Sequence, residues 1–206
     1  MTRENGHRIG SEQPRLLIVV GSTRPGRVGL PVAEWFTARA EAHGGFEVVV
    51  ADLAKIDLPL MDEPHHPRLG QYTKQHTKDW SALVDSADAF VFVTPEYNHA
   101  PPAPLINAID YLNAEWGHKP VGFVSYGGVS GGTRAVAILK QIVTVLKMMP
   151  LAEMVNLPFV AQVLQDGELR PNEITETAAT TMLDSLVRWS TALATLRTEA
   201  AAPAGR

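Results

Sequence analysis

The hydrophobic and polar positions of this chain alternate between two patterns along most of its length. Short apolar runs at 16–20, 46–50, 89–93 and 121–125 predict strands, and 155–163 contains a weaker fifth. Apolar residues at helical spacing over 32–42, 72–86, 104–112, 132–149 and 174–197 predict helices. Because apolar strands that alternate with helices are typical of a parallel sheet covered on both faces, the pattern predicts an α/β fold.

The order of the elements predicts one doubly wound domain over residues 15–197, with a five-stranded parallel sheet of order 2-1-3-4-5. Segment 55–71, interrupted by prolines, is predicted to be a long loop, and 1–14 and 198–206 to be disordered tails. In such a sheet the ligand binds beyond the carboxyl ends of the strands, beside strands one and three. The loops after strands one, three and four are therefore the candidate site.

The first of these loops, Gly21-Ser22-Thr23-Arg24-Pro25-Gly26-Arg27-Val28-Gly29, predicts an anion site. A turn of small residues between a strand and a helix points free N–H groups and the positive end of the helix at an anion. Arg24 and Arg27 add charge suited to phosphate. The loop matches neither the Walker A nor the G-x-G-x-x-G pattern, so the residues alone predict a phosphorylated ligand without naming it.

The second and third loops have features that suit a flat ligand. Prolines hold 94–102 extended, Tyr97 offers a flat surface, and the backbone around 96–98 can pair with the edge of a heterocycle. The glycines of 125–134 allow the backbone to approach a planar ligand closely.

Together the three loops resemble the NADPH-dependent FMN reductase family of flavodoxin-like proteins, over about 15–197. The motifs that carry the resemblance are Gly21-Ser22-Thr23-Arg24-Pro25-Gly26-Arg27, Pro95-Glu96-Tyr97-Asn98 and Ser125-Tyr126-Gly127-Gly128. The resemblance implies non-covalent FMN, held in three parts. Its phosphate would contact Ser22, Arg24, Arg27, Val28 and Gly29; one ring edge would contact Pro95, Glu96, Tyr97 and Asn98; and Ser125, Gly127 and Gly128 would close the other side. Arg27 and Gly29 stand where many relatives carry Ser and Asn.

The resemblance also implies the chemistry. NADPH or NADH would pass a hydride to flavin N5, and the reduced flavin would reduce a small acceptor, such as a flavin, quinone, azo or nitro compound, in a ping-pong cycle. No catalytic side chain is expected, because hydride transfer needs no dedicated acid or base. Backbone N–H groups of the glycine-rich loop would stabilise charge near N1 and O2. Relatives imply a homodimer or homotetramer.

Composition narrows the possible partners and location. The 206 residues carry a formal net charge of −4 and no cysteine. The charge argues against nucleic-acid partners, and the lack of cysteine excludes disulfides, thiol catalysis and cysteine-ligated metals. No run reaches the roughly 18 apolar residues of a membrane span, and 1–14 lacks the apolar core of a signal peptide. A cytoplasmic location without membrane contact is therefore expected.

Other interpretations stay open at this point. A flavodoxin-type electron carrier, or an FMN-binding module without turnover, fits the same loops. Gly128-Val129-Ser130-Gly131-Gly132 also matches the G-x-S-x-G motif of serine hydrolases. In those hydrolases the serine sits directly at the end of a strand and the catalytic histidine follows it in the chain. Here Ser130 lies beyond the predicted strand end, and the last histidine of the chain, His118, precedes it.

Two further groups of residues have no assigned role. His65 and His66, with Asp62, Glu63 and His76 nearby, are predicted to form a polar surface loop, and no metal is expected. Trp116 and His118 follow the helical pattern at 104–112. They are candidates for a subunit interface, for a flavin contact from a neighbouring subunit, or for core packing at a helix end.

Overall fold

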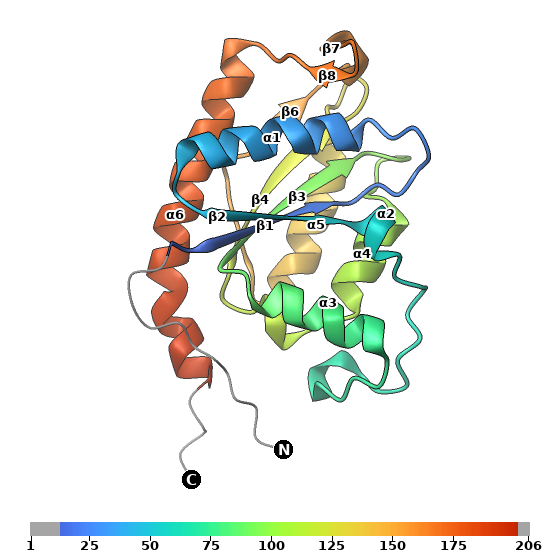
Figure 1. Ribbon diagram of the computed structural model, residues 1–206, viewed down its shortest axis with the longest axis vertical. Helices are drawn as coiled ribbons and strands as arrows, with labels where there is room; N and C mark the ends of the chain where they lie inside the picture. Colours follow the sequence, from blue (N-terminus) through green and yellow to red (C-terminus); the bar gives the residue numbers. More distant parts are fainter. Residues whose placement is uncertain (1–12, 202–206) are drawn as a thin grey trace.

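A parallel β-sheet forms the centre of the computed structural model, which describes residues 13–201 (Figure 1). Strands β1 (Arg15–Val20), β2 (Glu47–Asp52), β3 (Ala89–Pro95) and β4 (Pro120–Tyr126) pair in the order β2-β1-β3-β4-β5. The predicted α/β class and strand order are confirmed. All of these pairings are parallel, so the loops that follow β1, β3 and β4 leave from the same edge of the sheet.

The fifth position of the sheet is occupied by two short strands rather than one. β5 (Met149–Pro150) pairs with the start of β4, and β6 (Val155–Leu157) pairs with its end. Because β3 occupies the other side of β4, both short strands share one edge. The segment predicted to hold a weak fifth strand therefore contributes only its first residues, and the chain passes into the short helix η3 (Val160–Gln162).

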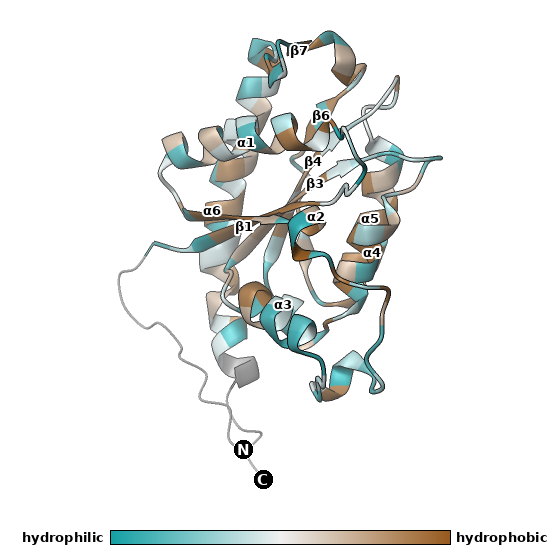
Figure 2. Ribbon diagram, turned by 45° about the vertical axis from the view of Figure 1, so that its right-hand side comes forward, coloured by the Kyte–Doolittle hydropathy of each residue, from teal (hydrophilic) through white to brown (hydrophobic). Residues whose placement is uncertain are grey.

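Helices cover both faces of the sheet, as predicted. α1 (Gly29–His43) and α6 (Glu173–Ala201) pack on one face. α3 (Gln75–Asp85), α4 (Ala103–Asp110) and α5 (Thr133–Val145) pack on the other. β1 supplies both cores, because side chains alternate along a strand: Leu16, Ile18 and Val20 point to the first face, Leu17 and Val19 to the second. Figure 2 shows β1 in the hydrophobic colour between these layers.

Some element ends differ from the predicted ones. α6 continues past Arg197 to Ala201, so part of the predicted C-terminal tail is helical; residues 1–12 and 202–206 lie outside the described range. Pro14, the last residue of the predicted N-terminal tail, accepts a hydrogen bond from the Glu47 amide. α5 ends four residues before the predicted Met149, because Lys147 has a left-handed backbone (φ 61°) that no helix continues through.

Trp116 belongs to the core, which settles one of the open roles. Its side chain is fully buried in the short helix η2 (Ala114–Trp116), 4.9 Å from Phe90 between ring centroids, and its indole N–H donates to the carbonyl of Ile109. His118 also serves the fold. It has a left-handed backbone (φ 58°), and its carbonyl accepts a hydrogen bond from Arg197.

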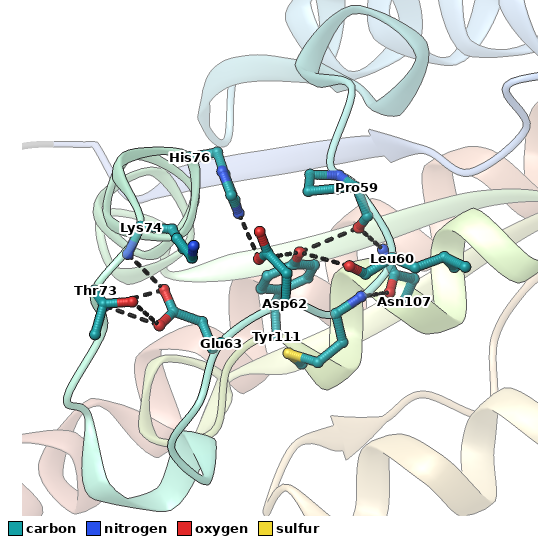
Figure 3. A network of polar contacts seen from close by, with 10 residues as sticks. Pro59, Leu60, Asp62, Glu63, Thr73, Lys74, His76, Asn107 and Tyr111 are labelled. Atoms are coloured by element: carbon teal, nitrogen blue, oxygen red, sulfur yellow. Dashed lines mark hydrogen bonds and ion pairs between the residues drawn. The ribbon is translucent and has the colours of Figure 1, made fainter.

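The long segment between β2 and α3 is more structured than the predicted loop. It contains the short helices α2 (Leu53–Ile56) and η1 (Pro67–Leu69). Polar side chains fasten its middle to α4, as Figure 3 shows: Asn107 and Tyr111 bind the Pro59 carbonyl, and the Tyr111 hydroxyl also donates to Asp62. Burial, followed by this hydrogen bond to Asp62, raises the pKa of Tyr111 to about 12.

Acidic side chains of this segment bind α3 and the residues just before it. The Asp62 carboxylate lies 3.0 Å from His76 Nε2, and Glu63 accepts hydrogen bonds from the Thr73 and Lys74 amides just before α3 (Figure 3). Within residues 13–201, no three His, Asp or Glu side chains are grouped to hold a metal ion.

Glu63 makes the stability of this segment depend on pH. Burial alone would raise the pKa of Glu63, but hydrogen bonds from the Thr73 and Lys74 amides and from the Thr73 hydroxyl lower it to about 2. Its contribution is therefore complete above about pH 4.5 and is lost as the pH falls toward 2. We expect Glu63→Gln to lower the free energy of unfolding by about 1 kcal/mol at pH 7, the usual net contribution of a hydrogen bond. Urea unfolding at several pH values should show this difference shrinking in acid.

The matched control is Glu34→Gln, an exposed glutamate on α1. It should leave both the stability and its pH profile unchanged. A Glu63→Gln difference that stays constant between pH 7 and pH 3 would contradict the assigned contacts.

Candidate functional site

The three loops predicted to form the site meet around one cavity of about 290 Å³. The loop between β1 and α1 and the end of β3 lie together at the right of Figure 1. The residues that line the cavity come from all three loops and from η3: Arg24, Pro25, Gly26, Arg27, Val28, Pro95, Glu96, Tyr97, Tyr126, Gly127 and Val160. The cavity therefore lies at the carboxyl edge of the sheet, beside β1 and β3, where the sequence predicts the site.

The start of α1 offers uncapped hydrogen-bond donors. Val28 is the N-cap residue and supplies no side-chain acceptor, and the first turn contains no acidic residue. The amides of Gly29 and Leu30 therefore belong to the first turn, whose N–H groups have no partner within the helix. Arg24 lies beside them, exposed, with no ion pair among the described residues. Free donors, positive charge and a helix N-terminus suit an anion.

Arg27 is oriented by a carboxylate from a neighbouring strand. Its guanidinium forms a largely buried ion pair with Asp52 at the end of β2, while Asp52 also accepts the Ala54 amide of α2. The Arg27 Nε is buried and has no hydrogen-bond partner among residues 13–201. Arg27 therefore contributes less free charge than expected, but it lines the cavity with one donor still unused.

The second loop is a tight hairpin, not the extended segment that its prolines predict. Tyr97 and Ala100 exchange two backbone hydrogen bonds of 2.9 and 3.0 Å, and Asn98 and His99 between them both have left-handed backbones (φ 51° and 67°). Positive φ at both central residues is the type I′ turn, which favours Asn at the first of them. Asn98 thus shapes the turn and does not line the cavity. The Tyr97 hydroxyl lies 3.0 Å from Ser22 Oγ, which joins the second loop to the first.

The Glu96 carboxylate joins the second loop to the third. It accepts hydrogen bonds from Ser130 Oγ (2.8 Å), the Arg134 amide (3.0 Å) and the Arg134 guanidinium (3.1 Å). Burial alone would raise the pKa of Glu96, but these hydrogen bonds lower it below its usual range. Ser130 therefore donates to a carboxylate and not to a histidine, so the geometry gives no support to the serine-hydrolase alternative.

The third loop is held from inside. Ser125, predicted to face the ring, is fully buried: its hydroxyl donates to the Gly131 carbonyl and accepts from Asn156. The loop crosses close above it, since a Cβ on Gly132 (φ 88°) would lie 2.7 Å from the Ser125 Cβ. Gly127 lines the cavity instead, and a Cβ there would meet only ordinary contacts at 3.5 Å or more.

The remaining predicted residues support the cavity from outside its lining. Ser22 contacts the Tyr97 hydroxyl, and Asn98 forms the turn that follows Tyr97. The Gly128 carbonyl accepts a hydrogen bond from the amide of Phe159. Phe159 is half exposed and has a left-handed backbone (φ 46°), which is rare for an aromatic residue. Gly29 lies under Tyr126: any Cβ at Gly29 would overlap the Tyr126 hydroxyl.

Four lining residues were not predicted as site residues. Pro25 and Gly26 lie within the first motif, and Val160 comes from a segment without a motif. Tyr126 lies inside one of the motifs, but its position at the end of an apolar strand gave no sign that its side chain reaches α1. Neighbouring residues of a strand point to opposite faces, so Tyr126 and Ser125 had to face opposite sides of the sheet. This alternation could have indicated the position of Tyr126.

Comparison with known proteins now defines the class. The family model described as NADPH-dependent FMN reductase matches residues 14–162, so the chain belongs to that family. It is an oxidoreductase with FMN and NAD(P)H as its cofactors. Among the described residues, no helix is long and apolar enough to cross a membrane.

Particular relatives agree with this class. An NAD(P)H-dependent FMN reductase from Schizosaccharomyces pombe is 42% identical over 137 residues, covering 66% of this chain and 68% of the relative. An NAD(P)H-dependent FMN reductase from Nectria sp. is 37% identical over 154 residues, covering 71% and 76%. The solved structure of FerB, a flavoenzyme NAD(P)H:acceptor oxidoreductase from Paracoccus denitrificans, shares the fold with a TM-score of 0.68 at 22% identity, covering 87% and 98%.

The residues around the cavity fit FMN. Arg27 Nε is a buried polar atom without a hydrogen-bond partner among the described residues, and Arg27 lines the cavity. The uncapped start of α1 and Arg24 suit a phosphate. Pro95, Tyr97 and Gly127 offer an apolar and aromatic lining for a ring.

Gly127 tests the position of the ring. We expect Gly127→Val to weaken FMN binding roughly tenfold or more, because a branched side chain would enter the cavity. Titration of the apoprotein with FMN, followed by flavin fluorescence, measures the change. The apoprotein should keep a melting temperature close to that of the wild type, since a Cβ at this position meets only ordinary contacts. Normal FMN affinity in a folded variant would remove the third loop from the site.

Proposed function

We propose that this chain binds FMN in the cavity between the three loops and uses it to carry electrons from NAD(P)H to a small acceptor. The observation that carries the proposal is that all three loops line one cavity, which has Arg24 and Arg27 in its lining and the uncapped start of α1 directly after the lining residue Val28. The phosphate would lie against these groups. The isoalloxazine ring would lie along Pro95, Glu96, Tyr97 and Gly127.

FMN, when bound, supplies the group that takes up a hydride from NAD(P)H and passes the electrons on. The chain contributes position and polarity. Amide groups of the loops donate hydrogen bonds where negative charge develops, and the hairpin at Asn98 fixes the backbone that faces the ring. No side chain is needed as an acid or base, which agrees with the Glu96 carboxylate being fully engaged in hydrogen bonds.

The acceptor is proposed to be a flat, partly apolar molecule. Tyr97 and Phe159 are aromatic side chains, 37% and 50% exposed, in the loops that surround the cavity. Exposed aromatic faces bind planar rings by stacking. Quinones, free flavins, azo dyes and nitroaromatic compounds share this shape, and among the relatives is a protein named quinone reductase from Pseudomonas putida.

The assembly is proposed to be a homodimer or homotetramer in the cytoplasm. Exposed apolar side chains support self-association: Leu60 and Leu69 are 82% and 60% exposed in the segment before α3. That segment is fastened to α4 by Asn107 and Tyr111, so it presents a fixed surface (Figure 3).

An absorption spectrum tests the function directly. The purified protein, loaded with FMN, should show a flavin spectrum that bleaches when NADPH or NADH is added without oxygen and returns when a quinone is added. A flavin spectrum that persists with both nucleotides would contradict the reductase and favour the carrier or the binding module. A protein that takes up no FMN would contradict the site.

Arg24 tests the phosphate position. Its side chain is exposed and has no ion pair among the described residues, so Arg24→Ala should leave stability within about 0.5 kcal/mol of the wild type. FMN affinity should fall roughly tenfold or more, because a hydrogen bond to a charged group contributes about 1.5–3 kcal/mol. Arg188→Ala, another exposed arginine, on α6 and away from the cavity, is the control and should change neither quantity. Unchanged FMN affinity in Arg24→Ala would refute the assignment.

A further inference from the structure

Phe159 keeps an aromatic side chain at a position where the backbone favours glycine. Its backbone is left-handed (φ 46°, ψ 47°), and the residue is 50% exposed. A left-handed conformation is costly for a bulky residue, because its Cβ comes close to the following carbonyl oxygen. Burial offsets only part of that cost, since half of the residue remains in water. Strain of this kind is concentrated at functional sites, which points to a ligand contact for the ring.

Backbone hydrogen bonds fix Phe159 beside the third loop. Its amide donates to the Gly128 carbonyl (2.9 Å), and the amide of Val160 donates to the Gly127 carbonyl (3.2 Å). Gly127 and Val160 both line the cavity. Phe159 therefore lies directly beside the lining, next to the part of the third loop that borders the proposed position of the flavin ring.

Two other exposed apolar residues adjoin Phe159. Val129, which follows Gly128 in the third loop, is 73% exposed. Pro158 is exposed and lies against the same loop, since a Cβ built on Gly131 would be 3.0 Å from its nitrogen. We call Val129, Pro158 and Phe159 the apolar rim. None of the three belongs to the cavity lining, so the rim extends the site beyond the cavity.

The chemistry of the apolar rim limits what it can bind. None of its side chains carries a charge or a hydrogen-bonding group, so a phosphate or sulfonate would lose water there and gain no partner. An apolar group, in contrast, gains free energy by leaving water. Tyr97 lines the cavity and is placed to meet the planar part of an acceptor, whereas the rim lies where a substituent of that planar part would project.

We propose that the apolar rim binds the apolar substituent of a neutral quinone and makes the protein prefer substituted quinones to unsubstituted ones. This inference rests on the proposed function, because the rim adjoins the cavity assigned to FMN. In the overall reaction NAD(P)H supplies a hydride and solvent supplies a proton, so that the quinone becomes a hydroquinone and the nucleotide becomes NAD(P)⁺. The substituent takes no part in this chemistry, so the rim acts on acceptor binding and not on electron transfer.

The experiment compares two acceptors that share one ring: a benzoquinone with a decyl chain and the same benzoquinone without it. Steady-state rates are measured with FMN-loaded wild type and Phe159→Gly at saturating NAD(P)H. In the wild type, we expect the KM for the decyl quinone to be roughly tenfold or more below that for the short quinone. Phe159→Gly should lose most of this difference through a higher KM for the decyl quinone, with kcat within about twofold of the wild type. Ferricyanide, an acceptor without an apolar substituent, should be reduced equally well by both proteins.

A second variant tests the rim against a matched exposed valine. Val129→Ser should raise the KM for the decyl quinone roughly threefold or more and leave the KM for the short quinone unchanged. Val145→Ser is the control, because Val145 is 82% exposed at the end of α5 that is farther from the third loop. It should change neither KM.

Glycine and alanine at position 159 test the backbone strain without any ligand. Phe159→Gly and Phe159→Ala both remove the ring, but only alanine keeps a Cβ in the left-handed conformation. We expect the apoprotein with glycine to melt roughly a few degrees higher than the apoprotein with alanine, the reverse of the usual order inside a helix or strand. An equal or lower melting temperature for the glycine variant would contradict the conformation on which the inference depends.

Other kinetic outcomes overturn the inference and leave the proposed function in place. Equal KM values for the two quinones in the wild type would show that the substituent meets no apolar surface. An equal rise of both KM values in Phe159→Gly would assign the ring to the shared quinone nucleus. A loss confined to the bleaching of the flavin by NAD(P)H would assign it to the nucleotide. If the wild type takes up no FMN, or its flavin is not bleached by NAD(P)H, the proposed function itself fails.

Discussion

The geometry of the site depends on the Glu96 carboxylate. It comes from the loop after β3, and its partners Ser130 and Arg134 come from the loop after β4 and the start of α5. One side chain therefore fixes the separation of two loops that are more than thirty residues apart in the chain. Because the hydrogen bonds outweigh burial and keep the pKa of Glu96 low, the carboxylate stays ionised, and its three bonds persist at neutral pH.

Close backbone approach is the second constraint, and two glycines meet it. Gly132 lets the third loop cross above the buried Ser125, and Gly29 leaves room for the Tyr126 hydroxyl at the start of α1. Because each glycine lacks a side chain, an atom of another residue can occupy the space beside its backbone. The consequences differ between the two positions. At Gly132 the third loop closes over Ser125, whereas at Gly29 the start of α1 comes close to the hydroxyl of Tyr126, a residue that lines the cavity.

The sequence was sufficient for the layers, the strand order and the three loops, because apolar runs and helical spacing report burial directly. It also located most of the cavity lining, including Arg24, Pro95, Tyr97 and Gly127. It did not resolve which way individual side chains point. Ser125 turned inward, and the resemblance gave no hint that Asp52, on a different strand, orients Arg27. Such pairings depend on the distance between strands in the folded sheet, which local patterns do not encode.

The charges around the cavity explain how a chain of net charge −4 can bind an anion. The carboxylates nearest to it, Asp52 and Glu96, are each paired with an arginine, so their charge is compensated within the loops. Arg24 has no such partner among the described residues, and the start of α1 adds partial positive charge. The charge that stays unpaired in the cavity lining is therefore that of an arginine, although the formal net charge of the chain is −4. This separation also removes free carboxylates from the cavity. They would repel a phosphate, and a reaction whose electrons move through a flavin does not need them.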